Sequence, residues 1–283
     1  MSTLSSDTKT KPERTLFRSN PVLNKLSKIT ERTETNSATY AGIASKTTFF
    51  LLVTLVGMIV QLLVMNSQPD SLARYTSFTV YEKFAASFTK NEAIILAAVV
   101  IVGFVCELIG IFVSRTIPVT GTVYSASQGY LISFLVFKVL NGYEYLGMEA
   151  LLLTVGVVLV MSWLYTSGTI KVDNKFRTVL LTLVLGSVSV GLLTFVGSLI
   201  PATRPFVQAM MANKGLVIAM DVLGLVIAAL FLISDFSMID TCVKEGYPKK
   251  YEWAAAFGLV FTVIWIYLKI LDLLMQFAGK DQT

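Results

Sequence analysis

Seven long apolar stretches constrain the fold of this chain more than any other feature. Each carries one charged residue or none, and they cover residues 48–66, 93–114, 116–137, 150–170, 178–203, 215–234 and 253–268, the last continuing to about residue 277. A helix needs about 20 residues to cross a hydrocarbon core of about 30 Å. The stretches therefore predict an all-α integral membrane protein with seven transmembrane helices.

The composition supports this class and excludes several others. Hydrophobic residues make up 54% of the chain and charged residues 14%, with a mean hydropathy of +0.70. A soluble domain carries about 25% charged residues, so a single water-soluble core is excluded. Histidine is absent, which removes Ser-His and Cys-His dyads and HExxH zinc sites. No Gly-rich phosphate loop or metal-ligand spacing occurs, and we predict no enzymatic activity, metal or cofactor.

The polar ends and the basic residues predict the domain organisation and the orientation. Residues 1–47 are expected to form a flexible cytoplasmic tail, 48–277 the seven-helix domain and 278–283 a short C-terminal tail. With seven spans, the N-terminal side carries 15 Lys or Arg and the opposite side 7. The positive-inside rule then places the N-terminus in the cytoplasm. Anionic lipid headgroups of the bilayer are the expected partner of the basic loops, and nucleic acid is not needed to explain them.

Three other features lead to expectations about loops and packing. Segment 67–92 holds Pro69 and several charges and is expected to form a surface helix on the outer side. Segment 236–252 is expected to be the longest cytoplasmic loop after the tail. The small residues Gly186 and Gly191 and the serines near them are expected to let helix backbones approach closely. Cys106 and Cys242 are expected to be reduced thiols.

Four charged residues lie inside the apolar stretches or at their ends: Glu107, Asp221, Asp235 and Lys269. An ionisable group at the bilayer centre costs about 2.5 to 3.5 kcal/mol on insertion scales, so each is a candidate functional residue. Asp221 on the sixth span and Lys269 on the seventh lie at similar depth in the outer half. They are predicted to form an ion pair, with Asp272 as a competing partner of Lys269 one turn away.

Glu107 and Asp235 both belong to the cytoplasmic half of the membrane. Two carboxylates close together in a low dielectric cannot both ionise cheaply, so one would hold a proton near neutral pH. This arrangement would make a pH switch built from carboxylates alone. Two structural alternatives remain open: Glu107 reaches toward the interface or bonds to a Ser or Gln, and Asp235 caps the end of its helix.

Several segments resemble a known family. They read SNPVLNK at 19–25, LYTSGTIKV at 164–172, KFR at 175–177, GYPKKYEWAAAFGL at 246–259 and IWIYLKIL at 264–271. The chain is similar to the bacterial branch of the Bax inhibitor-1/YccA-like membrane proteins over nearly its whole length. The resemblance implies a seven-helix fold with the last helix central. It also implies membership in a group linked to pH-dependent calcium leak and to restraint of cell stress or membrane-protease activity.

The resemblance also implies site residues. Better-studied members carry two aspartates that share a proton and gate the pore, one at the inner end of the sixth helix and one within the seventh. Asp235 matches the first, whereas Thr262 stands at the second. This departure removes the direct aspartate pair. Glu107, or Asp240 five residues after Asp235, is our candidate for the missing carboxylate, which is an inference from the residues and not part of the family pattern.

Three function classes follow from these observations. The first is a pH-sensitive leak channel for calcium or another cation in the bacterial inner (plasma) membrane. The alternative is a non-conducting membrane protein that binds and modulates a membrane-anchored protease or a stress response. A retinal protein is the third, prompted only by Lys269, and the third span lacks an acid to serve as its counter-ion.

Overall fold

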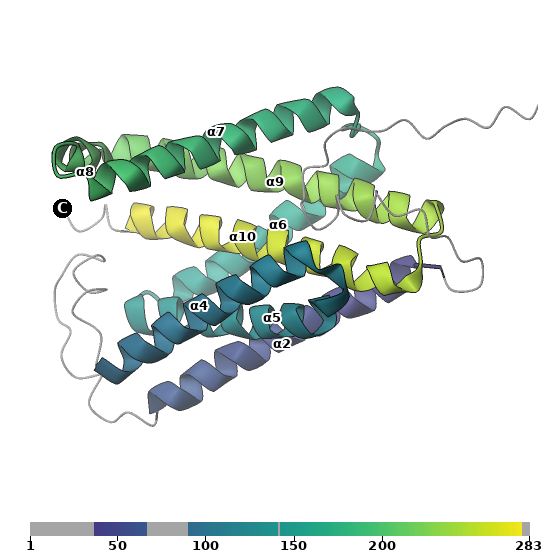
Figure 1. Ribbon diagram of the computed structural model, residues 1–283, viewed down its shortest axis with the longest axis horizontal. Helices are drawn as coiled ribbons and strands as arrows, with labels where there is room; N and C mark the ends of the chain where they lie inside the picture. The colour runs from purple at the N-terminus through teal and green to yellow at the C-terminus, as the bar shows by residue number, and fades with distance from the viewer. Residues whose placement is uncertain (1–36, 67–89, 141, 279–283) are drawn as a thin grey trace, which may run out of the picture.

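The computed structural model describes residues 37–66, 90–140 and 142–278, and these are almost entirely helical. Long helices run side by side in a bundle (Figure 1). In chain order they are α2 (Tyr40–Asn66), α4 (Lys90–Phe112), α5 (Ile117–Phe134), α6 (Tyr145–Thr166), α7 (Asn174–Leu199), α8 (Arg204–Ala212), α9 (Lys214–Lys244) and α10 (Glu252–Ala278). We call the end of the bundle where α2 begins the Tyr40 end, and the end where α10 finishes the Ala278 end.

Each of the seven predicted spans coincides with one helix, and the all-α membrane fold is confirmed. Within the described ranges, six helices are long and apolar enough to cross a membrane on their own. The seventh, α5, is rich in Gly, Ser and Thr and continues as a π-helical turn over Leu135–Val139. It packs against α2, α4 and α10, so most of its surface faces protein. A helix enclosed in this way needs less apolar surface than one that faces lipid.

The last helix is central, as the resemblance implied. In the most apolar 18-residue stretch of the span that contains α10, 67% of the residues are buried, against 6% to 39% in the corresponding stretches of the other five apolar spans of the described chain. Figure 1 shows α10 between α9 on one side and α4, α5 and α2 on the other, and it also packs on α6. Ala254, Ala255 and Ala256 lie fully buried near its start, where small side chains allow close approach of its neighbours.

Helices α2 and α5 make backbone contact through reciprocal glycines. A Cβ atom added at Gly129 would lie 1.9 Å from the carbonyl oxygen of Thr54. One added at Gly57 would lie 2.1 Å from the carbonyl oxygen of Ala126. Without a hydrophobic force between helices in lipid, such close packing is a main source of helix association. This contact holds α5 in the interior of the bundle.

Two helix ends differ most from the prediction. Helix α2 begins at Tyr40 and not at residue 48, so the last residues assigned to the tail are helical. Helix α9 continues to Lys244 and not to residue 234, because buried Met238 and Cys242 keep an apolar face on the bundle. The predicted loop over 236–252 is therefore wrong for 236–244, which are helical.

The turn after α9 is short and glycine-dependent. Gly246 has φ of +66°, a conformation that glycine adopts without steric cost. The Gly246 amide donates to the Val243 carbonyl, and the Tyr247 amide donates to the Cys242 carbonyl. These two bonds form a Schellman motif, which ends α9 and directs the chain back into α10 within a few residues.

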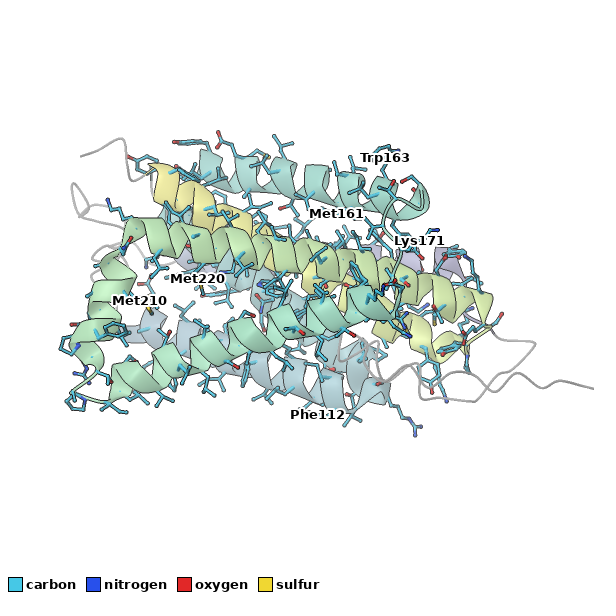
Figure 2. The ribbon with its side chains drawn as sticks, turned by 90° about the horizontal axis from the view of Figure 1, so that it is seen from above. Phe112, Met161, Trp163, Lys171, Met210 and Met220 are labelled. Carbon is cyan, nitrogen blue, oxygen red and sulfur yellow. The ribbon has the colours of Figure 1, made fainter. Side chains whose placement is uncertain are left out.

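The α7 and α8 helices lie at the edge of the bundle. Figure 2 shows α8, which carries Met210, running across the ends of α7 and α9. Gly186 and Gly191 have open space where a Cβ would stand, so the close packing predicted for the small residues of this span is wrong within the described chain. The physical reason is the position of α7, which packs only on α8 and α9 to any extent. Most of the segment predicted as a surface helix, 67–89, lies outside the described residues.

Candidate functional site

Asp235 lies inside the bundle and not at a helix end. Its side chain is 0% exposed, in the interface between α9 and the central helix α10. The Thr262 hydroxyl donates a hydrogen bond of 2.5 Å to Asp235 Oδ2. The cap alternative for Asp235 is therefore wrong, since α9 continues to Lys244. The two positions that the family resemblance singled out are in direct contact, as an acid and a hydroxyl.

The Thr262 hydroxyl has two acceptors within reach and one proton to donate. It lies 2.5 Å from Asp235 Oδ2 and 3.2 Å from the carbonyl oxygen of Gly258. When Asp235 is ionised, the Thr262 hydroxyl donates its hydrogen bond to the carboxylate. When Asp235 is protonated, its own proton can be donated to Thr262, whose hydroxyl then donates to Gly258. The three groups thus form a short relay with a satisfied arrangement in both protonation states.

The structure brings Asp221 and Lys269 together. Lys269 Nζ lies 2.8 Å from Asp221 Oδ1, and the Gln276 amide donates to Asp221 Oδ2 at 2.6 Å. Both oxygens of this carboxylate are therefore bonded to groups on α10. The side chains of Lys269 and Asp221 are 29% and 11% exposed. The cluster lies in the half of the bundle toward the Ala278 end.

Glu107 faces a different neighbour from the one predicted. Gly103 and Gly110, four residues before and three after it, share its helix face, and they approach Ser127 and Thr120 of α5. Glu107 is half-buried on this face of α4. Helix α10 lies between α9 and the α4–α5 pair (Figure 1). The predicted proximity of Glu107 and Asp235 is therefore wrong, because it assumed that equal depth meant neighbouring helices.

Asp240 also has partners of its own. Its carboxylate accepts hydrogen bonds from the Tyr40 hydroxyl and, at 3.1 Å, from the Tyr165 hydroxyl. Lys244 lies 2.5 Å away, one turn further along α9. Five residues turn a helix by about 140°, so Asp240 points well away from the Asp235 side. Its contacts tie α9 to α2 and α6 at the Tyr40 end.

A buried ion pair at the Tyr40 end was missed from the sequence. Glu252, at the start of α10, is 0% exposed and lies 2.5 Å from Lys46 of α2. It also accepts bonds from the Thr39 amide at 2.9 Å and the Thr39 hydroxyl at 3.3 Å. A Cβ on Gly42 would lie 2.2 Å from this carboxylate, so a larger residue there would displace it from its partners. Lys46 lies in the segment that the sequence predicts as the tail. The sequence feature that could have indicated a buried pair is the acid Glu252 in the first turn of the final helix.

A second buried pair, also missed, joins the ends of α4 and α5 at the opposite end of the bundle. Lys138, in the π-helical turn, forms a salt bridge with Glu92, and both side chains are at most 9% exposed. Because the two residues flank predicted spans, the sequence indicates only that their charges lie at the membrane surface. Only the antiparallel packing of α4 on α5 places them against each other.

The described residues contain no group of three or more His, Cys, Asp or Glu that could hold a metal ion. Neither Cys106 nor Cys242 is joined in a disulfide bond within the described residues. The candidate site is therefore the acid-hydroxyl contact of Asp235 and Thr262 together with the Asp221 and Lys269 pair, all between α9 and α10.

Comparison with known proteins gives one result for nearly the whole chain. Residues 20–279 match the family model described as Bax inhibitor 1 like. No curated protein matches the chain.

Proposed function

The chain belongs to the Bax inhibitor 1-like family of multi-pass membrane proteins, and from this premise we propose that it is a pH-sensitive leak channel for cations, calcium first. We propose no enzymatic activity for it. The observation that carries the proposal is the fully buried carboxylate of Asp235 in the interface of the central helix.

The chemistry of this carboxylate suits a cation pathway. An ionisable group within a membrane is costly and in most cases serves substrate, ion or proton movement. Carboxylate oxygens are the hard ligands that calcium prefers. Asp235 lies on the face of α9 that packs against the most enclosed helix of the bundle. A cation that moved along this interface would meet its negative charge.

Sensitivity to pH follows from the relay of Asp235, Thr262 and Gly258. A proton on Asp235 removes its full charge, and the Thr262 hydroxyl can then turn to the Gly258 carbonyl. No polar group of the relay loses its hydrogen bond in this exchange, so both states are accessible. One acid and one hydroxyl can therefore support the pH response that two aspartates provide in other family members.

We also propose that the Tyr40 end faces the cytoplasm of a bacterial cell, with the protein in the inner membrane. The excess of Lys and Arg on this side supports the orientation.

The test is calcium flux through the purified protein in liposomes, measured from about pH 5 to 8. We expect Asp235→Asn, which keeps the shape and removes the charge, to change flux severalfold at neutral pH and to flatten its pH profile. The electrostatic interaction energy that the cation loses is on the order of 1 kcal/mol or more, as for a partly desolvated charge interaction. Asp173→Asn is the control, because Asp173 is an exposed helix cap outside the interface. If Asp235→Asn conducts like the parent over this pH range, the proposal is refuted.

Thr262 supports a second candidate function. Because a hydroxyl stands where the family pattern has an acid, the paired-aspartate gate is incomplete, which favours a non-conducting protein that modulates a membrane-anchored protease or a stress response. Co-purification of a membrane partner, together with absence of flux from the parent protein, would select this candidate.

A further inference from the structure

The polar residues between α9 and α10 follow one regular spacing. On α10, Thr262, Lys269 and Gln276 are seven residues apart, which is about two turns, so they lie on one face. On α9, Asp221 and Asp235 are fourteen residues apart and likewise share a face. We call these five residues the α9–α10 seam. At about 1.5 Å per residue, its two acids are separated by roughly 21 Å along the helix.

The two helices are antiparallel, and the seam has two bonded layers. Thr262 bonds to Asp235 at 2.5 Å, and Gln276 bonds to Asp221 at 2.6 Å. Lys269 stands midway between Thr262 and Gln276 in the sequence of α10. Its side chain reaches Asp221 at 2.8 Å. The seam therefore holds one ammonium group along a line that has a carboxylate at each end.

The absence of a side chain at Gly224 leaves room for the aliphatic part of Lys269. A Cβ atom on Gly224 would lie 3.3 Å from Lys269 Cε and 3.5 Å from Cδ, which is tighter than ordinary van der Waals contact for the first of these. Gly224 is three residues from Asp221, on the same side of α9. The lysine thus lies along α9, and its ammonium group is bonded to Asp221 Oδ1.

We infer that Lys269 is the internal counter-ion that sets cation flux through the α9–α10 seam. It occupies Asp221 Oδ1 as a tethered cation, and Gln276 bonds to Oδ2, so Asp221 itself offers no vacant oxygen to a passing ion. This inference rests on the proposed conduction. A pair that served only to neutralise itself would stabilise the fold without influence on ion selectivity.

The effect should depend on the charge of the ion. Coulomb energy is proportional to that charge, so a change in barrier for Ca²⁺ is twice that for K⁺ at the same place. The factor by which the flux of Ca²⁺ changes is then the square of the factor for K⁺. A wider or leakier protein would change both fluxes by similar factors.

The experiment measures K⁺ and Ca²⁺ flux into liposomes that contain the full-length protein. Lys269→Met vacates Asp221, and we expect K⁺ flux to rise about threefold and Ca²⁺ flux about ninefold. Lys269→Arg keeps the charge, so the ratio of Ca²⁺ flux to K⁺ flux should stay close to that of the parent. Lys269→Met with Asp221→Asn removes the acid as well and should reverse the larger rise of Ca²⁺ flux relative to K⁺ flux.

Asp221→Asn alone decides the question if Lys269→Met does not fold. It keeps the shape of the carboxylate and removes the negative charge bonded to the Lys269 ammonium, so both fluxes should fall, and that of Ca²⁺ by the larger factor. Equal fluxes in a conducting parent and in these variants would overturn the inference and leave the proposed function standing. Absence of flux from the parent and from every variant would overturn both.

Discussion

The buried pair of Lys46 and Glu252 allows a stability prediction of defined size. In Lys46→Met the Glu252 carboxylate stays 0% exposed but loses the ammonium 2.5 Å away. Removal of one partner from a buried pair costs about 3 to 5 kcal/mol. The two bonds from Thr39 remain, and the lysine side chain is 15% exposed, so we expect the lower limit of about 3 kcal/mol.

The reverse substitution should be milder. Glu252→Gln keeps a side-chain oxygen that can accept the Thr39 amide bond. It leaves Lys46 at the edge of the bundle, where its ammonium can reach water. We expect a loss of about 1 kcal/mol, the usual value for one hydrogen bond. The double variant should be more stable than Lys46→Met alone, because it buries no unpaired charge.

Thermal unfolding in detergent measures these differences through thiol labelling. Cys242 is fully buried in the same cluster as Tyr247 and Ala254, close to the pair, so its reaction with a fluorogenic maleimide reports unfolding there. A Cys106→Ser background restricts the signal to this thiol. At about 2 to 4 °C per kcal/mol for a chain of this size, Lys46→Met should lower the Tm by about 6 to 12 °C.

The control is Lys171→Met, which removes an exposed lysine in the connection between α6 and α7 (Figure 2). Our reasoning would be refuted by a Tm for Lys46→Met equal to that of this control. A double variant less stable than Lys46→Met would also contradict it.

Two further predictions use the same melting assay. Gly129→Ala places a methyl group against the Thr54 carbonyl and should destabilise the protein by about 1 to 3 kcal/mol. The control Gly186→Ala meets open space and should be neutral or slightly stabilising. Equal effects of the two substitutions on the Tm would show that α2 and α5 do not pack backbone to backbone. Lys138→Gln leaves Glu92 buried without its salt-bridge partner and should lower the Tm more than the double variant with Glu92→Gln, and a larger loss in the double variant would contradict a buried pair.

Local composition determined which segments cross the membrane. All seven predicted spans are helices, and for six of them hydropathy over about 20 residues is enough to make the segment stable in hydrocarbon. The seventh, α5, also depends on the helices that enclose it. Helix ends were less predictable. Residues 236–244 read as a polar loop, but Met238 and Cys242 are buried against the bundle, and this tertiary contact extends α9 to Lys244.

The contact of Asp221 with Lys269 could be anticipated because the two helices follow each other in the chain, and depth alone then brings their charges together. Asp235 and Thr262 were singled out by resemblance, and the distance between them came from the structure.

The order of the helices around α10 was decided only by tertiary structure. Depth suggested a meeting of Glu107 and Asp235, yet α10 stands between their helices (Figure 1). Lys46 and Glu252 meet although 206 residues separate them. The physical reason is that lipid is as apolar as a leucine side chain, so hydropathy does not distinguish a face that meets lipid from one that meets another helix. Close packing at glycines and bonds between buried polar groups make that distinction, and both depend on residues distant in the sequence.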